Sequence, residues 1–344
     1  MPTPGSPCPT TVPSPERRWR ALAGWLLLAL VAFGPLIDTR LHMGNVNSDL
    51  AAIESLVERG TFFINDASVD TIDKFRRGDL YFSQKSPIFH LVGAAVCAPL
   101  HAAGITLRDH PEAVLRALTL ILVVLPMGVL LWAVGEHPWV RLRGRRWRLG
   151  LPLVVAFGSL MTPWAITLNH YAGAATAMML AARRLASMRE DRPSRDGAAV
   201  GFWLSVSFAC DIPPAFLALG MVGVWWLLRA RREPAMRRCL VWLAIGAAPL
   251  LLLYSALNRV IVGSFLPPNM HEKEMLYYEG SYWAELREAA EQGRPGYYQA
   301  SYTRRLLHAT VGHKGVYWMM PLLAVATVGA WRLARRRAPG WELR

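Results

Sequence analysis

The chain contains little cysteine. Only four of its 344 residues are cysteines, and no two of them form a CxxC pair or a spacing that is typical of a metal site. Zinc fingers that bind the metal through cysteine need closely spaced pairs, and small disulfide-stabilised folds are rich in cysteine, so the sequence favours neither. We expect the four thiols to be reduced or buried and to carry no chemistry; they are Cys8, Cys97, Cys210 and Cys239.

Acidic residues are also few in comparison with basic ones. The chain has 24 Asp and Glu against 38 Lys and Arg, which gives a formal net charge of +14. Such an excess favours nucleic-acid binding when it forms one continuous patch. Here the basic residues form short clusters between apolar runs, a pattern typical of loops beside an anionic membrane surface. We therefore expect no nucleic-acid partner.

Charge is absent from several long stretches, and these indicate the fold class. Hydrophobic residues make up 53% of the chain, and Ala21–Ile37 and Ala117–Gly135 contain no charged side chain. Because roughly 17–25 apolar residues cross the hydrocarbon core of a bilayer, the sequence predicts an all-α polytopic membrane protein. The first run is long for a signal sequence and no small-x-small cleavage site follows it, so we expect an uncleaved anchor after a disordered cytoplasmic tail, residues 1–20.

The positions of the basic clusters predict the topology. Arg17, Arg18 and Arg20 precede the first helix, so its start is expected to be cytoplasmic and its end near Asp38 external. The later clusters fall on the cytoplasmic side only if the apolar run 86–105 does not cross the membrane. We therefore predict that this run is a membrane-seated segment on the outer face. The clusters are residues 141–148, 183–195, 229–238 and 332–337.

The same argument predicts eight spanning helices in one transmembrane domain, residues 21–331. External loop 1 covers residues 38–112, a second external loop covers residues 259–312, and a basic cytoplasmic tail covers residues 332–344. With both termini in the cytoplasm, the protein is expected in the inner (plasma) membrane. The predicted spans lie near residues 21–37, 113–135, 150–168, 171–188, 197–210, 214–230, 238–258 and 313–331.

Asp49 lies in a predicted amphipathic helix directly after the first span. Leu50, Ile53 and Leu56 repeat at helical spacing, and Gly60 follows as a stop signal. The sequence leaves two interpretations of the acid. It is either a first-turn carboxylate that the helix macrodipole favours, or a base that accepts a proton from, or orients, an acceptor hydroxyl.

External cations form the second group of candidates. Lys85 precedes Ser86-Pro87, where a helix is expected to begin, so its ammonium would lie beside a helix N-terminus at the depth of lipid phosphates. The alternative is a lysine that only reaches to the membrane surface. Basic residues on the external side, in the last external loop and at the start of the span after it, run against the usual charge asymmetry and favour an anionic ligand such as a phosphate; they are Arg304, Arg305, His313 and Lys314.

Two further polar residues lie at predicted helix ends on the outer face. His170, in the turn Asn169-His170-Tyr171, is either a structural histidine or part of a site. Asp211, between Phe208-Ala-Cys and Ile-Pro-Pro, lies at the apolar boundary, where a charge requires a partner.

These motifs together resemble the GT-C glycosyltransferases, most of all bacterial members of the protein mannosyltransferase type. The resemblance rests on Asp49 after the first helix, on the loop Asp73–Pro87, and on Asn169-His170 and Gly312–Pro321 as external motifs. Where the family has paired acids this chain has Asn47-Ser48-Asp49, and its Lys-Pro-Pro element is Lys85-Ser86-Pro87.

The resemblance implies transfer of a sugar from a polyprenyl-phosphate donor to a lipid or glycan acceptor, with inversion, on the external face. It implies that Asp49 is the acceptor-side base and that Lys85 contacts the phosphate. Asp73 and Asp211 are the alternative carboxylates, and His170 is a secondary residue of the acceptor site. A divalent metal ion that bridges Asp49 and the phosphate is compatible with this chemistry, although no ligand cluster in the sequence requires one.

Two other functions are kept open. A transporter or lipid flippase would use the same external groups to line a path, but it predicts polar residues near helix centres and internal repeats, and the sequence has neither. A non-catalytic membrane protein derived from such an enzyme is the second alternative, since only one carboxylate follows the first helix.

Overall fold

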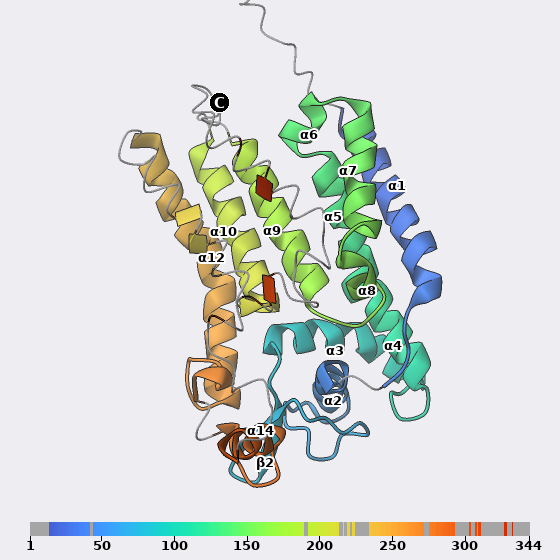
Figure 1. The fold of residues 1–344 in the computed structure, drawn as a ribbon, viewed down its shortest axis with the longest axis vertical. Coiled ribbons are helices and arrows are strands. Elements are labelled where there is room, and N and C mark those ends of the chain that lie inside the picture. Colours follow the sequence, from blue (N-terminus) through green and yellow to red (C-terminus); the bar gives the residue numbers. More distant parts are fainter. Residues whose placement is uncertain are drawn as a thin grey trace, which may run out of the picture.

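The protein is predominantly helical, and its computed structural model describes residues 14–41, 44–188, 192–212 and 234–292, apart from 272–274, together with isolated residues outside these ranges. Most of the described helices run side by side as a bundle (Figure 1). The principal helices of the bundle are α1 (Pro15–Phe33), α4 (Pro111–Thr119) continued by η2 (Leu120–Val124) and α5 (Leu125–Gly135), α7 (Arg145–Phe157), α9 (Tyr171–Ala186), α10 (Pro193–Cys210) and α12 (Pro234–Ile261).

Three helical stretches within the described residues are long and apolar enough to cross a membrane. They are Pro15–Leu36, Pro111–Gly135 and Arg237–Ile261. The outer faces of the first and last expose apolar side chains, among them Val31 and Leu252, as expected of helices that contact lipid. These helices support the prediction of a helical membrane protein.

The prediction of eight spanning helices is not reproduced. The expected span 150–168 is broken, because α7 ends before Gly158 and only the short helix α8 (Met161–Ala165) follows. The expected span 171–188 corresponds to α9, which has 16 residues and carries arginines in its last turn. The expected span 197–210 forms part of α10, which starts with polar residues. Sequence reasoning counted the apolar runs but not the breaks and charges that shorten them. Most of the expected spans 214–230 and 313–331 lies outside the described residues.

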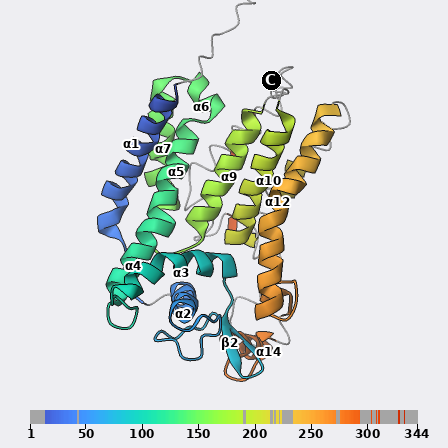
Figure 2. The ribbon, with the colours of Figure 1, turned by 180° about the vertical axis from the view of Figure 1, so that it is seen from behind.

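Two helices lie across one end of the bundle instead of along it. They are α2 (Gly44–Arg59) and α3 (Pro87–Ala102), and both views show α3 running transverse to α9 and α10 (Figures 1 and 2). Leu50 and Ile53 of α2 pack with Leu115 and Leu118 of α4 in a buried core. The helix expected near Asn47 is α2, and the apolar run after Lys85 forms α3; their placement relative to a membrane stays a prediction.

A β-hairpin, which the all-α prediction did not anticipate, joins α2 to α3. Strand β1 (Lys74–Arg77) pairs antiparallel with β2 (Leu80–Ser83), and Gly78 makes the turn at φ +61°. Glycine suits this left-handed conformation, and Gly-Asp is a two-residue hairpin signal that the sequence reading missed. The Arg77 guanidinium donates to the carbonyl oxygens of Val260 and Ile261 at 2.9 and 3.1 Å, which ties the hairpin to the end of α12.

The basic clusters that the structure describes gather at the opposite end of the bundle. The start of α1, the short helix α6 (Pro138–Leu142), the end of α9 and the starts of α10 and α12 all lie there (Figures 1 and 2). Arg148 pairs with the buried carboxylate of Glu136, and Arg184 lies 2.5 Å from Asp196. This is the arrangement required if the clusters share one side of a membrane; residues 333–337 lie outside the description.

The contact between α10 and α12 gives a first prediction. A Cβ atom at Gly201 would overlap the carbonyl oxygen of Leu243, and a backbone atom cannot move aside as a flexible side chain can. We expect Gly201→Ala to destabilise the folded protein by about 1–3 kcal/mol because it forces two packed helices apart. Thermal unfolding in detergent measures this effect. The control is Gly150→Ala in α7, where a Cβ meets no atom within 4 Å; equal destabilisation by both variants would contradict the prediction.

Candidate functional site

Asp49 is buried in the middle of α2. Because α2 begins at Gly44, Asp49 lies in its second turn, so the first-turn interpretation of this acid is wrong. The residue is 1% exposed, and its Oδ1 lies 3.0 Å from Nε2 of His90. A carboxylate so far from water is stable only with a partner, and the imidazole supplies the hydrogen bond.

His90 comes from α3, one turn after the helix begins at Pro87. The Ser86 hydroxyl donates to the carbonyl oxygen of Ala209, which fixes the start of α3 against the end of α10. Sequence reasoning did not identify His90 as part of a site. Its signal was present: Pro87, His90, Gly93 and Cys97 share one helical face, and the structure buries all four.

Two serines extend the Asp49–His90 pair. Ser83 Oγ lies 2.7 Å from Ser48 Oγ and 3.4 Å from His90 Nε2, and the Ser48 hydroxyl lies 2.6 Å from the Asp73 carbonyl oxygen. Ser83 and Asp49 thus approach the same imidazole nitrogen. In a Ser-His-Asp relay the serine and the acid bind opposite nitrogens, so this geometry is not that of a serine hydrolase.

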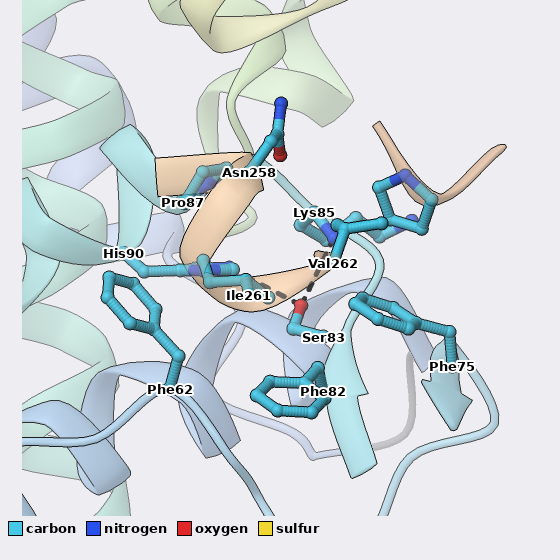
Figure 3. Close-up of a pocket in the computed structure, with 11 residues that line it drawn as sticks. Phe62, Phe75, Phe82, Ser83, Lys85, Pro87, His90, Asn258, Ile261 and Val262 are labelled. Atoms are coloured by element: carbon cyan, nitrogen blue, oxygen red, sulfur yellow. Dashed lines mark hydrogen bonds between the residues drawn. The ribbon is translucent and has the colours of Figure 1, made fainter. Parts of the chain in front are cut away.

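Lys85 lies next to this network and is paired with Asp73. Its Nζ is 3.1 Å from Asp73 Oδ2, and the two side chains are only 17% and 14% exposed. The Lys85 backbone N–H donates to Ser83 Oγ at 3.2 Å (Figure 3). Asp73, expected as an alternative acceptor-side carboxylate, is therefore the ion-pair partner of the predicted phosphate ligand.

His170 and Asp211 approach the same end of the bundle from α9 and α10. His170 is 7% exposed, its ring packs edge-on against Phe89 at 6.0 Å between centroids, and its Nδ1 has no hydrogen-bond partner among the described residues. Burial lowers the pKa of His170, while the charges of Asp49 and Asp211 oppose that shift. Burial raises the pKa of Asp211, opposed by His170 and Lys85. Four residues predicted from the sequence therefore belong to one electrostatic cluster: Asp49, Lys85, His170 and Asp211.

A narrow crevice opens beside Lys85 and His90 (Figure 3). One wall is polar, with Ser83, Lys85 and His90, and the rest is mainly apolar. Its volume of about 10 Å³ admits a single water molecule and no sugar, so a larger ligand needs the hairpin and the end of α12 to separate. The other lining residues are Phe62, Phe75, Phe82, Pro87, Asn258, Ile261, Val262 and Pro268.

Comparisons with known proteins do not assign the chain. No family model, no curated protein and no solved structure matches it. The function is therefore inferred from the residues and the geometry of the site.

The remaining predicted site residues and a metal site are not placed. Within the part of the chain that the structure describes, no three His, Cys, Asp or Glu side chains lie close enough together to hold a metal ion. Arg304, Arg305, His313 and Lys314, predicted as phosphate ligands, lie outside the described residues. What the structure brings together is a proton acceptor, Asp49 with His90, and a cation, Lys85, within one loop-and-helix unit.

Proposed function

We propose that this protein is a membrane glycosyltransferase that moves a sugar from a polyprenyl-phosphate donor to an acceptor hydroxyl, with inversion. The single observation that carries the proposal is the buried Asp49–His90 pair beside the Lys85 cation, at the end of the bundle opposite the arginine clusters. Such a transfer needs a base for the acceptor and a cation for the leaving phosphate, and both groups are present there.

In this proposal the acceptor hydroxyl gives its proton to the Asp49 carboxylate as its oxygen attacks the anomeric carbon. His90 donates its Nε2–H to the same carboxylate and holds it in position, at 3.0 Å. Because Asp49 is 1% exposed and lies behind His90, which lines the crevice while Asp49 does not, the acceptor reaches the carboxylate only after the segments around His90 have moved apart. Removal of water from a site of this kind strengthens the electrostatic interactions within it.

The bond from the anomeric carbon to the phosphate oxygen breaks in the same step, and the phosphate leaves with its negative charge. Lys85 offsets that charge, which requires its ammonium to exchange Asp73 for the phosphate. Asp211 is the second carboxylate of the cluster and comes from α10, whereas Asp49 comes from α2.

The alternative of a transporter or flippase has less support. Three buried hydroxyls in the bundle helices donate to backbone carbonyls of their own helices: Thr119 to Leu115, Thr176 to Ala172 and Ser205 to Phe202. These three do not mark a polar path, whereas the buried Ser207 hydroxyl of α10 has no hydrogen-bond partner among the described residues. A non-catalytic role is the other alternative, and the assay below separates it from an enzyme.

The test of the function is to incubate the purified full-length protein with a panel of polyprenyl-phosphate sugars. We expect release of polyprenyl phosphate, by hydrolysis or by transfer to added acceptor lipids or glycans. Movement of labelled lipid across a vesicle membrane without cleavage would instead support the flippase. A protein that binds these donors but neither cleaves nor moves them would support the non-catalytic alternative.

We also propose that the arginine end faces the cytoplasm of a cell whose inner membrane holds the protein, with both termini on that side. Arg145 is exposed at that end and Arg108 is exposed at the other. In a background without native cysteines, Arg145→Cys should react with a membrane-impermeant maleimide only after the cells are permeabilised. Arg108→Cys should react in intact cells. The reverse pattern would overturn the orientation.

A further inference from the structure

The corner between α6 and α7 carries more positive charge than the acidic side chains of the described residues neutralise. Gly144 makes the turn at φ +91°, a left-handed conformation that favours glycine. Two arginines of the corner, Arg141 and Arg148, pair with the buried carboxylate of Glu136. Three more arginines are exposed, and no ion pair joins them to an acidic side chain of the described chain; they are Arg143, Arg145 and Arg146.

The same corner exposes large apolar side chains. Trp139 is 56% exposed, Leu142 70% and Trp147 55%. Exposed tryptophans beside arginines are typical of the boundary between the hydrocarbon and the headgroups of a membrane, where the indole ring meets both environments.

An apolar stripe continues from these arginines along α7. Leu149, Leu153 and Phe157 follow Arg145 at intervals of four residues, so all four lie on one face of the helix. The three apolar side chains are 48%, 39% and 55% exposed. Helix α7 has 13 residues and is therefore about 20 Å long, enough to lie beside most of one acyl chain.

We propose that this corner is a binding site for an anionic phospholipid, with the headgroup phosphate on Arg145 and Arg146 and an acyl chain along the stripe. Arginine binds phosphate through paired N–H donors, which favours this headgroup chemistry over a neutral one. The continuity of charge and apolar stripe distinguishes a lipid from a free phosphate or a nucleic acid, neither of which would cover Leu149, Leu153 and Phe157. This site is separate from the proposed catalytic site and does not depend on it.

The test measures thermal unfolding of the purified full-length protein in a neutral detergent with added phosphatidylglycerol. The comparison lipid is phosphatidylcholine with the same acyl chains, and glycerol phosphate at the same concentration serves as the free headgroup. At a hundredfold excess over the dissociation constant, phosphatidylglycerol should raise the melting temperature by about 3 °C or more. The other two should raise it by less than half of that.

The variant R143Q/R145Q/R146Q should lose the stabilisation by phosphatidylglycerol. The charge-matched control R76Q/R108Q/R116Q, which removes three exposed arginines from the other end of the molecule, should keep it. An undiminished rise in the corner variant would overturn the proposal. Equal rises with phosphatidylcholine or with glycerol phosphate in the native protein would also overturn it, and this comparison holds even if the variant fails to fold.

Discussion

Asp49→Asn is expected to lower the rate of sugar transfer about 1,000-fold and to leave the protein folded. A positioned general base contributes roughly 10²–10⁴ to a rate, and an amide cannot take the proton of the acceptor. The amide keeps the size of the carboxylate and still accepts a hydrogen bond from the His90 Nε2–H, so the packing of α2 against α3 should survive. Turnover with a lipid-linked donor measures the effect, and melting temperature and size-exclusion chromatography report the fold.

The matched control is Glu54→Gln, a second buried acid on α2. Glu54 is 4% exposed and accepts the Ser68 backbone N–H at 2.7 Å through Oε2, a bond that a glutamine oxygen can also accept. We expect this variant to keep near-normal turnover, since Glu54 lies outside the proposed catalytic cluster. A normal rate in Asp49→Asn, or equal losses in both variants, would remove Asp49 as the base.

His90→Gln tests whether the pair acts as a unit. We expect a loss of about 10- to 100-fold, because the carboxylate keeps its base function but loses the imidazole that orients it. Combined with Asp49→Asn, the second change should add little, since orientation no longer matters once the base is gone. Fully additive losses would mean that the two residues act separately.

The features that sequence reasoning predicted correctly are those that depend on local sequence pattern. Apolar runs predicted the helical class, and charge asymmetry predicted that the Arg clusters would gather at one end of the bundle, as the described clusters do. Periodicity predicted the helix after the first span, which α2 confirms, whereas the absence of a membrane crossing in the run after Lys85 stays a prediction. The number of spans could not be obtained this way, because the ends of α7 and α9 depend on short breaks and on charges.

The site was predicted only in part for a related reason. Asp49 and Lys85 were identified from their positions beside helix starts, but their partners depend on tertiary packing. His90 is 41 residues from Asp49 in the sequence, and their contact exists because α2 and α3 cross closely. At that crossing a Cβ on Gly93 would overlap Ile53, so the small residue sets the approach of the two helices. The crossing could not be predicted from local pattern, and although Gly78-Asp79 signals a hairpin, the pairing of Asp73 with Lys85 depends on how that hairpin packs.

The Lys85–Asp73 pair leads to two predictions of opposite sign. Lys85→Ala should weaken binding of a polyprenyl-phosphate donor about 10- to 100-fold, because a charge-assisted hydrogen bond of about 1.5–3 kcal/mol to the phosphate is lost. Asp73→Asn should instead tighten donor binding, since the phosphate no longer competes with a carboxylate 3.1 Å from the ammonium. A gain of affinity on removal of an acid is difficult to produce by general destabilisation, so the second variant distinguishes phosphate contact from a structural ion pair.

Donor affinity is measured by equilibrium binding of a fluorescent polyprenyl-phosphate sugar to the purified protein. Lys74→Ala is the control, because Lys74 lies in the same hairpin and is paired with Asp70 at 2.7 Å, yet does not line the crevice. It should leave donor affinity within about twofold of the native value, as expected for an exposed ion pair. If Lys85→Ala and Asp73→Asn both weaken binding to a similar degree, the pair is structural, and the phosphate must be bound by other cations. If Lys85→Ala weakens donor binding and Asp73→Asn strengthens it, the Lys85 ammonium binds the donor phosphate. Asp73 is then its partner only while the donor is absent.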